Sequence, residues 1–203
     1  MPLESLKRRK GVKMTREEII EIFTKSGAML TGHFRLTSGK HSNNYFQCAQ
    51  VLQVPQYTKQ LCKELADRFR QQEVETVIGP AMGGIIVSYE VARALGVRSL
   101  FTERENGKMA LRRNFNITPG EKVLVVEDVI TTGGSVAEVI EVVRKLGGQV
   151  VGVGVLVDRS NGKADLGVRT EALLTVSVET YDPDNCPLCE QGIPAVKPGS
   201  RKS

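Results

Sequence analysis

Residues 123–135 read VLVVEDVITTGGS, an apolar run followed by two acids and a loop of small residues. The β-branched run Val123–Val126 predicts a strand that is buried on both faces of a parallel sheet. Glu127 and Asp128 follow the run, and a helical pattern begins at about Val136. Ligands of open α/β sheets bind outside the carboxyl ends of the strands. We therefore expect an α/β fold with a binding site at this turn.

The loop between this strand and helix suits a phosphate group. Glycines allow the backbone to approach closely, a helix N-terminus offers unpaired N–H groups, and hydroxyls add donors. Glu127 and Asp128 repel a phosphate and suit ribose hydroxyls or a hydrated magnesium ion. An ordinary βα turn, capped by Thr and Gly, is the alternative. The loop residues expected to bind are Thr131, Thr132, Gly133, Gly134 and Ser135.

A second glycine-rich turn, GPAMGG at residues 79–84, has the same setting. It follows a buried strand expected at Val74–Ile78 and precedes a helix expected at Ile85–Leu95. The backbone amides at such a helix start can hold a second phosphate group. A strand–helix connection without a ligand is the alternative.

Residues 103–115, ERENGKMALRRNF, are expected to form a hairpin arm around Asn106-Gly107. One interpretation is a solvated arm. The other is an arm that closes over an anionic leaving group, since cations match pyrophosphate oxygens. The cations that the arm carries are Arg104, Lys108, Arg112 and Arg113.

The stretch EDVITTGGS resembles the phosphoribosyl-pyrophosphate (PRPP) motif of type I phosphoribosyltransferases. The resemblance implies that Glu127 and Asp128 hold the ribose hydroxyls, with Mg²⁺ bound nearby through PRPP, and that the following loop wraps the 5-phosphate. It also implies that residues 79–84 form the pyrophosphate loop and that 103–115 is the mobile catalytic loop, shared across a homodimer. The further PRPP-binding residues so implied are Ala81, Met82, Gly83, Arg104 and Lys108. The catalytic residues so implied are Glu127, Asp128, Arg104 and Lys108.

Residues 29–47 are polar, turn-rich and, by composition alone, typical of a surface hairpin. They also resemble the N-terminal hood of orotate phosphoribosyltransferases, in which GxFxLxSGxxSxxY recurs, and every marked place is filled here. The resemblance implies that the Ser38-Gly39 turn meets the pyrimidine and that Tyr45 and Phe46 close over it. It also assigns Thr131 and Arg159 to orotate, whereas a surface ion pair of Asp158 with Arg159 is the alternative.

The bulk properties are those of one domain with small additions. The chain has 203 residues, 40% of them hydrophobic and 25% charged, and a net charge of +5. No apolar stretch approaches the roughly 18 residues that span a membrane, and the basic N-terminus lacks the apolar core of a signal peptide, which favours a cytoplasmic protein without a membrane partner. Much of the basic excess lies at the two ends, and no aromatics are interleaved there, so no nucleic-acid partner is expected. The expected parts are a flexible basic extension (1–13), a phosphoribosyltransferase domain (14–180, with the hood at about 28–50 and the core at about 55–180) and an extended tail (181–203).

Four cysteines are present, and in the cytoplasm they should be reduced. Cys186 and Cys189 form a CxxC, a pattern that can supply half of a zinc site. No second CxxC completes it, and His33 and His41 are far away in sequence. We therefore favour a structural turn over a metal site, whose other half a dimer partner would have to supply.

Together these features predict a type I phosphoribosyltransferase fold, a mostly parallel central sheet flanked by helices with a small N-terminal hood. The resemblance implies an enzyme that converts orotate and PRPP to orotidine 5′-phosphate and pyrophosphate. Gly83 and Glu105 stand where many orotate enzymes carry lysine, which leaves a purine phosphoribosyltransferase open. A regulator that binds PRPP without turnover is a further alternative, although a nearly neutral body disfavours it.

Overall fold

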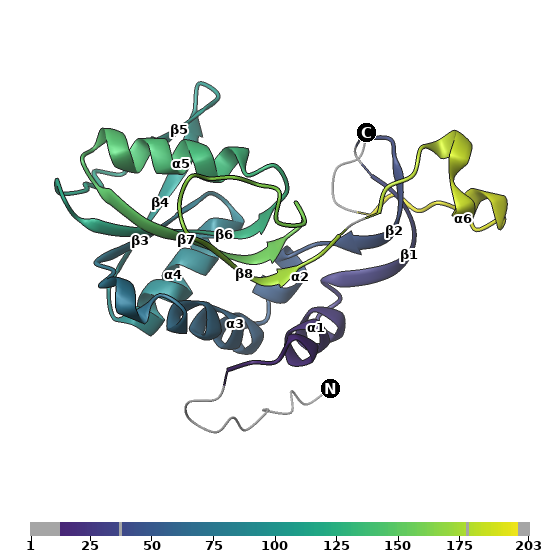
Figure 1. The fold of residues 1–203 in the computed structure, drawn as a ribbon, viewed down its shortest axis with the longest axis horizontal. Helices are drawn as coiled ribbons and strands as arrows, with labels where there is room; N and C mark the ends of the chain where they lie inside the picture. Colours follow the sequence, from purple (N-terminus) through teal and green to yellow (C-terminus); the bar gives the residue numbers. More distant parts are fainter. Residues whose placement is uncertain (1–12, 37, 178, 199–203) are drawn as a thin grey trace.

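The computed structural model describes residues 13–36, 38–177 and 179–198 (Figure 1). A six-stranded sheet has the strand order β5-β4-β3-β6-β7-β8, and a separate two-stranded hairpin is formed by β1 and β2. All neighbours in the large sheet are parallel except the pair β4–β5. The strands are β1 (Met29–Arg35), β2 (His41–Phe46), β3 (Thr76–Pro80), β4 (Arg98–Glu105), β5 (Lys108–Leu111), β6 (Lys122–Ile130), β7 (Gln149–Asp158) and β8 (Thr170–Thr175).

Helices cover both faces of the large sheet, α5 on one side and α3 and α4 on the other (Figure 1). Each face has its own cluster of fully buried apolar side chains, which confirms the predicted α/β layering. The helices are α1 (Arg16–Lys25), α2 (Ala49–Leu52), α3 (Pro55–Asp67), α4 (Gly83–Leu95), α5 (Gly134–Lys145) and α6 (Pro187–Glu190), with 3₁₀ turns η1 (Arg70–Gln72) and η2 (Pro183–Asn185).

The strand order places the two glycine-rich turns side by side. From β3 the chain crosses to β4 on one side, and from β6 it crosses to β7 on the other. The order of the sheet therefore reverses between β3 and β6, which are direct neighbours. Such a switch point opens a crevice beyond the carboxyl ends of the two strands. Residues 79–84 and 131–135 both lie there.

Local sequence signals account for several element boundaries. Thr15 forms a capping box with Glu18 at the start of α1, and Pro55 is the first residue of α3. Asn106 and Gly107 have φ values of 49° and 81° and connect β4 to β5, so the predicted hairpin arm is confirmed. Strand β6 runs to Ile130, because its pairing with β7 continues beyond the acidic pair.

The segment after Tyr181, expected to be an extended tail, folds back onto the hairpin. It contains η2 and α6, and it pairs at both of its ends with the hairpin, His41 with Tyr181 and Phe34 with Val196. Figure 1 shows this segment beside β1 and β2, away from the large sheet. The pairing explains the difference, since backbone partners on the hairpin are not visible in the tail's own sequence. We call the hairpin, residues 28–50, the hood.

The expected basic extension lies outside the described residues, apart from Lys13. Within the described ranges, no helix has the length and apolar character needed to cross a bilayer.

Candidate active site

The acidic pair lies near the carboxyl end of β6. Glu127 is 9% exposed and Asp128 is half-buried. The Asp128 N–H donates to Glu127 Oε1 at 3.1 Å. Burial, followed by the hydrogen bond and the charge of Asp128, raises the pKa of Glu127 to about 9. The buried member of the pair therefore holds its proton more tightly than an ordinary glutamate.

The turn after β3 packs directly against this pair. A Cβ atom on Gly83 would lie 2.5 Å from Asp128 Cγ, and one on Gly84 would lie 3.2 Å from Glu127 Oε1. The Ala81–Met82 peptide bond in this turn is cis. The absence of a lysine at Gly83 thus has a steric reason, because the Asp128 carboxylate occupies the space that its side chain would need.

The loop after β6 surrounds a hollow of about 90 Å³ at the start of α5. Gly133, with φ at 81°, is the N-cap, and Thr131 and Thr132 are exposed. Glu127 lies at one end of the same hollow. An anion in this position faces unpaired amides and the positive end of the helix dipole, as the sequence predicts for a phosphate.

Arg159 follows β7, the next strand along the sheet. Its Nε atom is buried and has no hydrogen-bond partner among the described residues. The Asp158 carboxylate accepts from the amides of Ser160 at 2.7 Å and Gly162 at 2.9 Å. Asp158 therefore holds the following loop and forms no ion pair with Arg159, which leaves a guanidinium available to a ligand.

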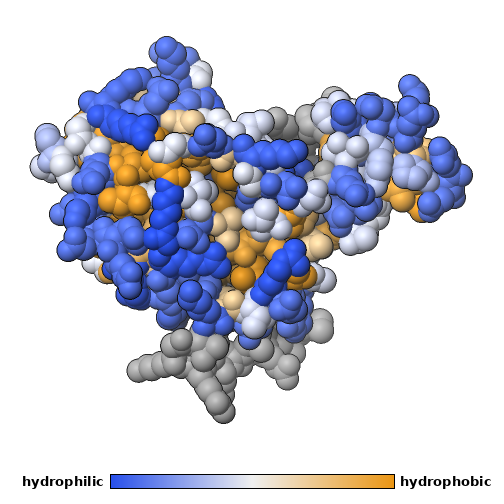
Figure 2. All heavy atoms as spheres, viewed as in Figure 1, coloured by the Kyte–Doolittle hydropathy of each residue, from blue (hydrophilic) through white to orange (hydrophobic). Residues whose placement is uncertain are grey.

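The hood meets the acidic pair at its C-terminal end. The Cys48 thiol donates to the Asp128 carbonyl at 3.7 Å, and burial, together with the nearby charge of Asp128, raises the pKa of this thiol. Figure 2 shows the surface hollowed between the large sheet domain and the hood. A ligand at the switch point would therefore lie between the two parts.

The hood residues expected at the pyrimidine do not all face one way. Ser38 is exposed, and Gly39 has φ at 85° in the turn between β1 and β2. Tyr45 is half-buried against Phe34, with ring centroids 5.8 Å apart. Phe46 is only 7% exposed and belongs to the core cluster below. Successive side chains of a strand point to opposite faces, so the hairpin does not present Tyr45 and Phe46 as a pair.

The arm formed by β4 and β5 is held against α5. Arg104 makes two hydrogen bonds to the Glu138 carboxylate, at 3.1 and 3.2 Å, and the Met109 amide donates to the same group. Lys108, at the start of β5, is exposed. Sequence reasoning missed Glu138, because an acidic residue on a helix face gives no signal of a distant arginine partner.

Sequence reasoning also missed the partners of the CxxC. His33 and His41 lie beside Cys186 and Cys189, and the potential ligand atoms of the four side chains are all within 4.8 Å of one another. The CxxC therefore has two histidines beside it, although we expected none to complete it. Strand pairing across the hood, invisible as a local pattern, brings the two histidines together.

A buried acidic pair between two anion-binding turns suits a sugar that carries phosphate groups at two positions. A comparison with known families agrees, since residues 49–168 match the phosphoribosyl transferase domain. The fold and the site thus define a phosphoribosyltransferase of type I.

The chain belongs to the orotate phosphoribosyltransferase family. The orotate phosphoribosyltransferase of Desulforamulus reducens is 85% identical over 189 residues, which cover 93% of this chain and 99% of that protein. That of Pelotomaculum thermopropionicum is 74% identical over 189 residues, 93% of this chain and 100% of the relative. Among solved structures, orotate phosphoribosyltransferase from Aeropyrum pernix has a TM-score of 0.65 at 30% identity, covering 78% of this chain and 93% of its own.

Proposed function

We propose that this chain transfers the phosphoribosyl group of PRPP to orotate, forming orotidine 5′-phosphate and pyrophosphate. The observation that carries the proposal is the acidic pair at the switch point, with Gly83 of the turn after β3 against Asp128 and Gly84 of the same turn against Glu127. Relatives that cover almost the whole chain bear the name of this activity.

The reaction needs positioning and charge stabilisation more than a nucleophilic side chain. The bond between the anomeric carbon and the pyrophosphate oxygen breaks as the bond to the orotate nitrogen forms, with oxocarbenium character. Orotate is already an anion, so it supplies the electron pair itself. Glu127 and Asp128 hold the ribose hydroxyls, Thr131–Ser135 hold the 5-phosphate, and the amides of residues 81–83 hold the leaving group.

Magnesium fits this site. Two adjacent carboxylates offer the oxygen ligands that Mg²⁺ prefers, and Mg²⁺ commonly binds through one or two carboxylates together with substrate phosphates. Asp128 and Glu127 would hold it. When bound, the ion neutralises charge on the pyrophosphate.

We assign the pyrimidine to the hollow between Arg159 and the hood. The unpartnered guanidinium supplies a planar pair of donors for the orotate carboxylate and ring carbonyl. The exposed Ser38-Gly39 turn, Tyr45 and Thr131 complete the contacts. Phe46 packs in the core and does not take part in these contacts.

Replacing Arg159 with Ala should therefore weaken the binding of orotate far more than the binding of PRPP. Loss of a charge-assisted pair costs about 1.5–3 kcal/mol, or roughly a 10- to 150-fold rise in the KM for orotate. Steady-state kinetics with each substrate varied in turn measure this. Lys163→Ala, an exposed cation on the same loop, is the matched control. Equal losses for both substrates would contradict the assignment.

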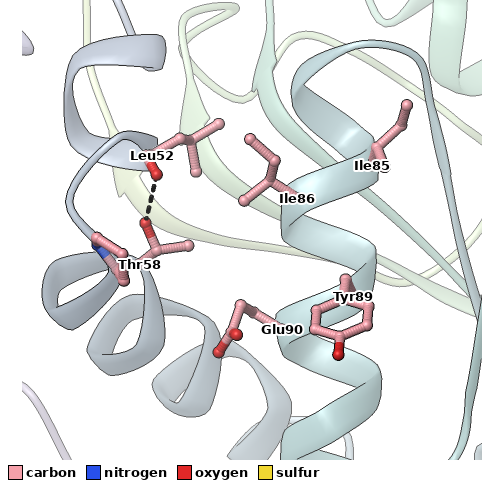
Figure 3. Close-up of a pocket in the computed structure, with 7 residues that line it drawn as sticks. Leu52, Thr58, Ile85, Ile86, Tyr89 and Glu90 are labelled. Carbon is pink, nitrogen blue, oxygen red and sulfur yellow. Dashed lines mark hydrogen bonds between the residues drawn. The ribbon is translucent and has the colours of Figure 1, made fainter.

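We also propose a homodimer that covers the apolar face of α4. A pocket of about 330 Å³ lies between α2, α3 and α4. Figure 3 shows Leu52 and Ile86 pointing toward one another across it. Met82 and Tyr89 beside it are 81% and 63% exposed, which is unusual for large apolar side chains. Because α4 begins in the pyrophosphate turn, a second copy seated here lies next to that turn. Its arm 103–115 then has a route into the site.

Mixed dimers test the shared arm. A chain with Arg104→Ala keeps its site, and a chain with Asp128→Asn keeps its arm, so a mixed dimer contains one complete site if the arm acts on the partner. Mixing the two inactive variants in equal amounts should restore about one quarter of wild-type activity. Arg112→Ala, paired with Glu105 on the same arm, is the control. No recovery in mixtures whose subunit exchange is verified by mass spectrometry would exclude a shared arm.

A base panel tests the proposed activity. The full chain is assayed with PRPP and Mg²⁺ against orotate, uracil, adenine, guanine and xanthine. Turnover of orotate alone is expected, because the Arg159 guanidinium matches a carboxylate that the other bases lack. Turnover of a purine would keep the PRPP site and overturn the base assignment. PRPP binding without turnover would point to a regulator instead.

A further inference from the structure

Four side chains from distant parts of the chain converge at the hood. His33 comes from β1, His41 is the first residue of β2, and Cys186 and Cys189 flank the short helix α6. His33, His41 and Cys186 are 3%, 8% and 1% exposed, whereas Cys189 is exposed. Buried polar groups that converge in this way require partners.

The distance from each sulfur to its nearer histidine nitrogen matches a tetrahedral metal centre, whereas the two nitrogens lie closer together than in such a centre. Zinc bonds of about 2.0–2.1 Å to nitrogen and 2.3 Å to sulfur place tetrahedral ligand atoms about 3.3–3.8 Å apart. Here His33 Nε2 and His41 Nδ1 are 2.9 Å apart, Cys189 Sγ is 3.3 Å from His41 Nδ1, and Cys186 Sγ is 3.6 Å from His33 Nε2. The set is closed, with two nitrogens and two sulfurs, as in structural zinc sites.

A hydrogen bond outside the cluster orients one of the ligands. His33 Nδ1 lies 2.6 Å from the carbonyl oxygen of Ile193. The carbonyl only accepts, so the proton is on Nδ1 and the lone pair of Nε2 faces the cluster. A hydrogen bond from His41 Nδ1 to His33 Nε2 would satisfy these two rings without a metal, but it gives no reason for two thiols to meet them.

We propose that His33, His41, Cys186 and Cys189 bind one Zn²⁺ ion, which fastens residues 181–196 to the hood. Two thiolates balance the charge of the ion, so the centre is neutral where it is buried. The same two histidines pair with this segment through their backbones: the His41 amide donates to Tyr181 at 2.8 Å, and the Val196 amide donates to His33 at 2.9 Å.

A metal ion would stabilise residues 181–196, because this segment has little apolar packing of its own. Neither core cluster of the described residues includes a side chain beyond Val176. Small lobes without a core are commonly stabilised by a metal or a disulfide. The hood carries the Ser38-Gly39 turn, so the ion also sets the shape of the surface that we assign to orotate; this last consequence rests on the proposed function.

Metal analysis of the full chain tests the proposal without substrate. Wild-type protein is loaded with Zn²⁺, and the unbound ion is removed. Inductively coupled plasma mass spectrometry should then find one zinc per chain. The double variant Cys186→Ser, Cys189→Ser should retain at least about tenfold less zinc per chain, since both sulfur ligands are lost. Cys62→Ala, a buried thiol of α3 outside the cluster, is the matched control and should retain one zinc.

A second measurement keeps the test valid if the variant fails to fold. Metal-stripped wild-type protein is titrated with Co²⁺, which should give the visible absorption of tetrahedral cobalt with thiolate ligands and saturate at one ion per chain. Peptide mapping after alkylation should show Cys189 protected only when metal is bound. Three results would each overturn the proposal. The wild-type protein could bind less than one zinc or cobalt per chain, the double variant could retain zinc, or Cys186 and Cys189 could form a disulfide. None of these readouts depends on turnover, so they stand apart from the proposed activity.

Discussion

Changing Asp128 to Asn should reduce kcat/KM for PRPP on the order of 10²-fold while the fold is retained. The carboxylate lies against the turn at Gly83 and beside buried Glu127, so its charge acts in a poorly solvated place. An amide keeps the shape but loses charge-assisted bonds to the ribose and the stabilisation of positive charge that develops on the sugar. Steady-state kinetics and thermal unfolding of the same samples measure the two effects separately.

The control for this prediction changes charge without touching the site. Glu141→Gln converts an exposed carboxylate of α5, which pairs with Lys145, and should leave the kinetics unchanged. If Asp128→Asn turned over PRPP at the wild-type rate, the acidic pair would have no part in ribose binding.

Gly83→Ala should also lower kcat/KM for PRPP strongly, because the added methyl group clashes with Asp128. The added Cβ would lie 2.5 Å from Asp128 Cγ and within 2.7 Å of both carboxylate oxygens, so the carboxylate must move. Such crowding costs about 1–3 kcal/mol, and a displaced carboxylate no longer meets the ribose. We expect a loss in kcat/KM for PRPP of roughly tenfold or more.

A double-mutant cycle identifies the cause. In an Asp128→Ala background the carboxylate is gone, so Gly83→Ala should add little further loss. Additive losses would mean that Gly83 acts through the pyrophosphate turn itself and not through Asp128.

Much of the fold could be predicted from local patterns. The capping box at Thr15, the Asn106-Gly107 hairpin and the β-branched runs each specify a backbone conformation within a few residues. The order of strand, acidic pair, small-residue loop and helix also predicts a phosphate site, since the ligand-binding groups are contiguous in the chain. These features depend on neighbours in sequence, which is why local patterns can predict them.

Other features depend on contacts between segments far apart. Only the tertiary structure explains why glycine, and not lysine, stands at position 83. Strands β3 and β6 are neighbours, and Asp128 fills the space that a larger side chain would need. Arg104 was expected at the pyrophosphate, yet Glu138 on α5 holds it in this structure. Residues 181–196 gain their shape from strand partners in the hood.

The chain order of residues 123–135 was therefore sufficient for the class of fold and for the loop that we propose as the phosphate site, because a strand, a turn and a helix start are short-range structures. The cluster of His33, His41, Cys186 and Cys189 needed the tertiary structure, since its members are separated by up to 156 residues and share no local period. Backbone pairing of the hood with residues 181–196 brings these four side chains together, although no regular spacing in the sequence relates them.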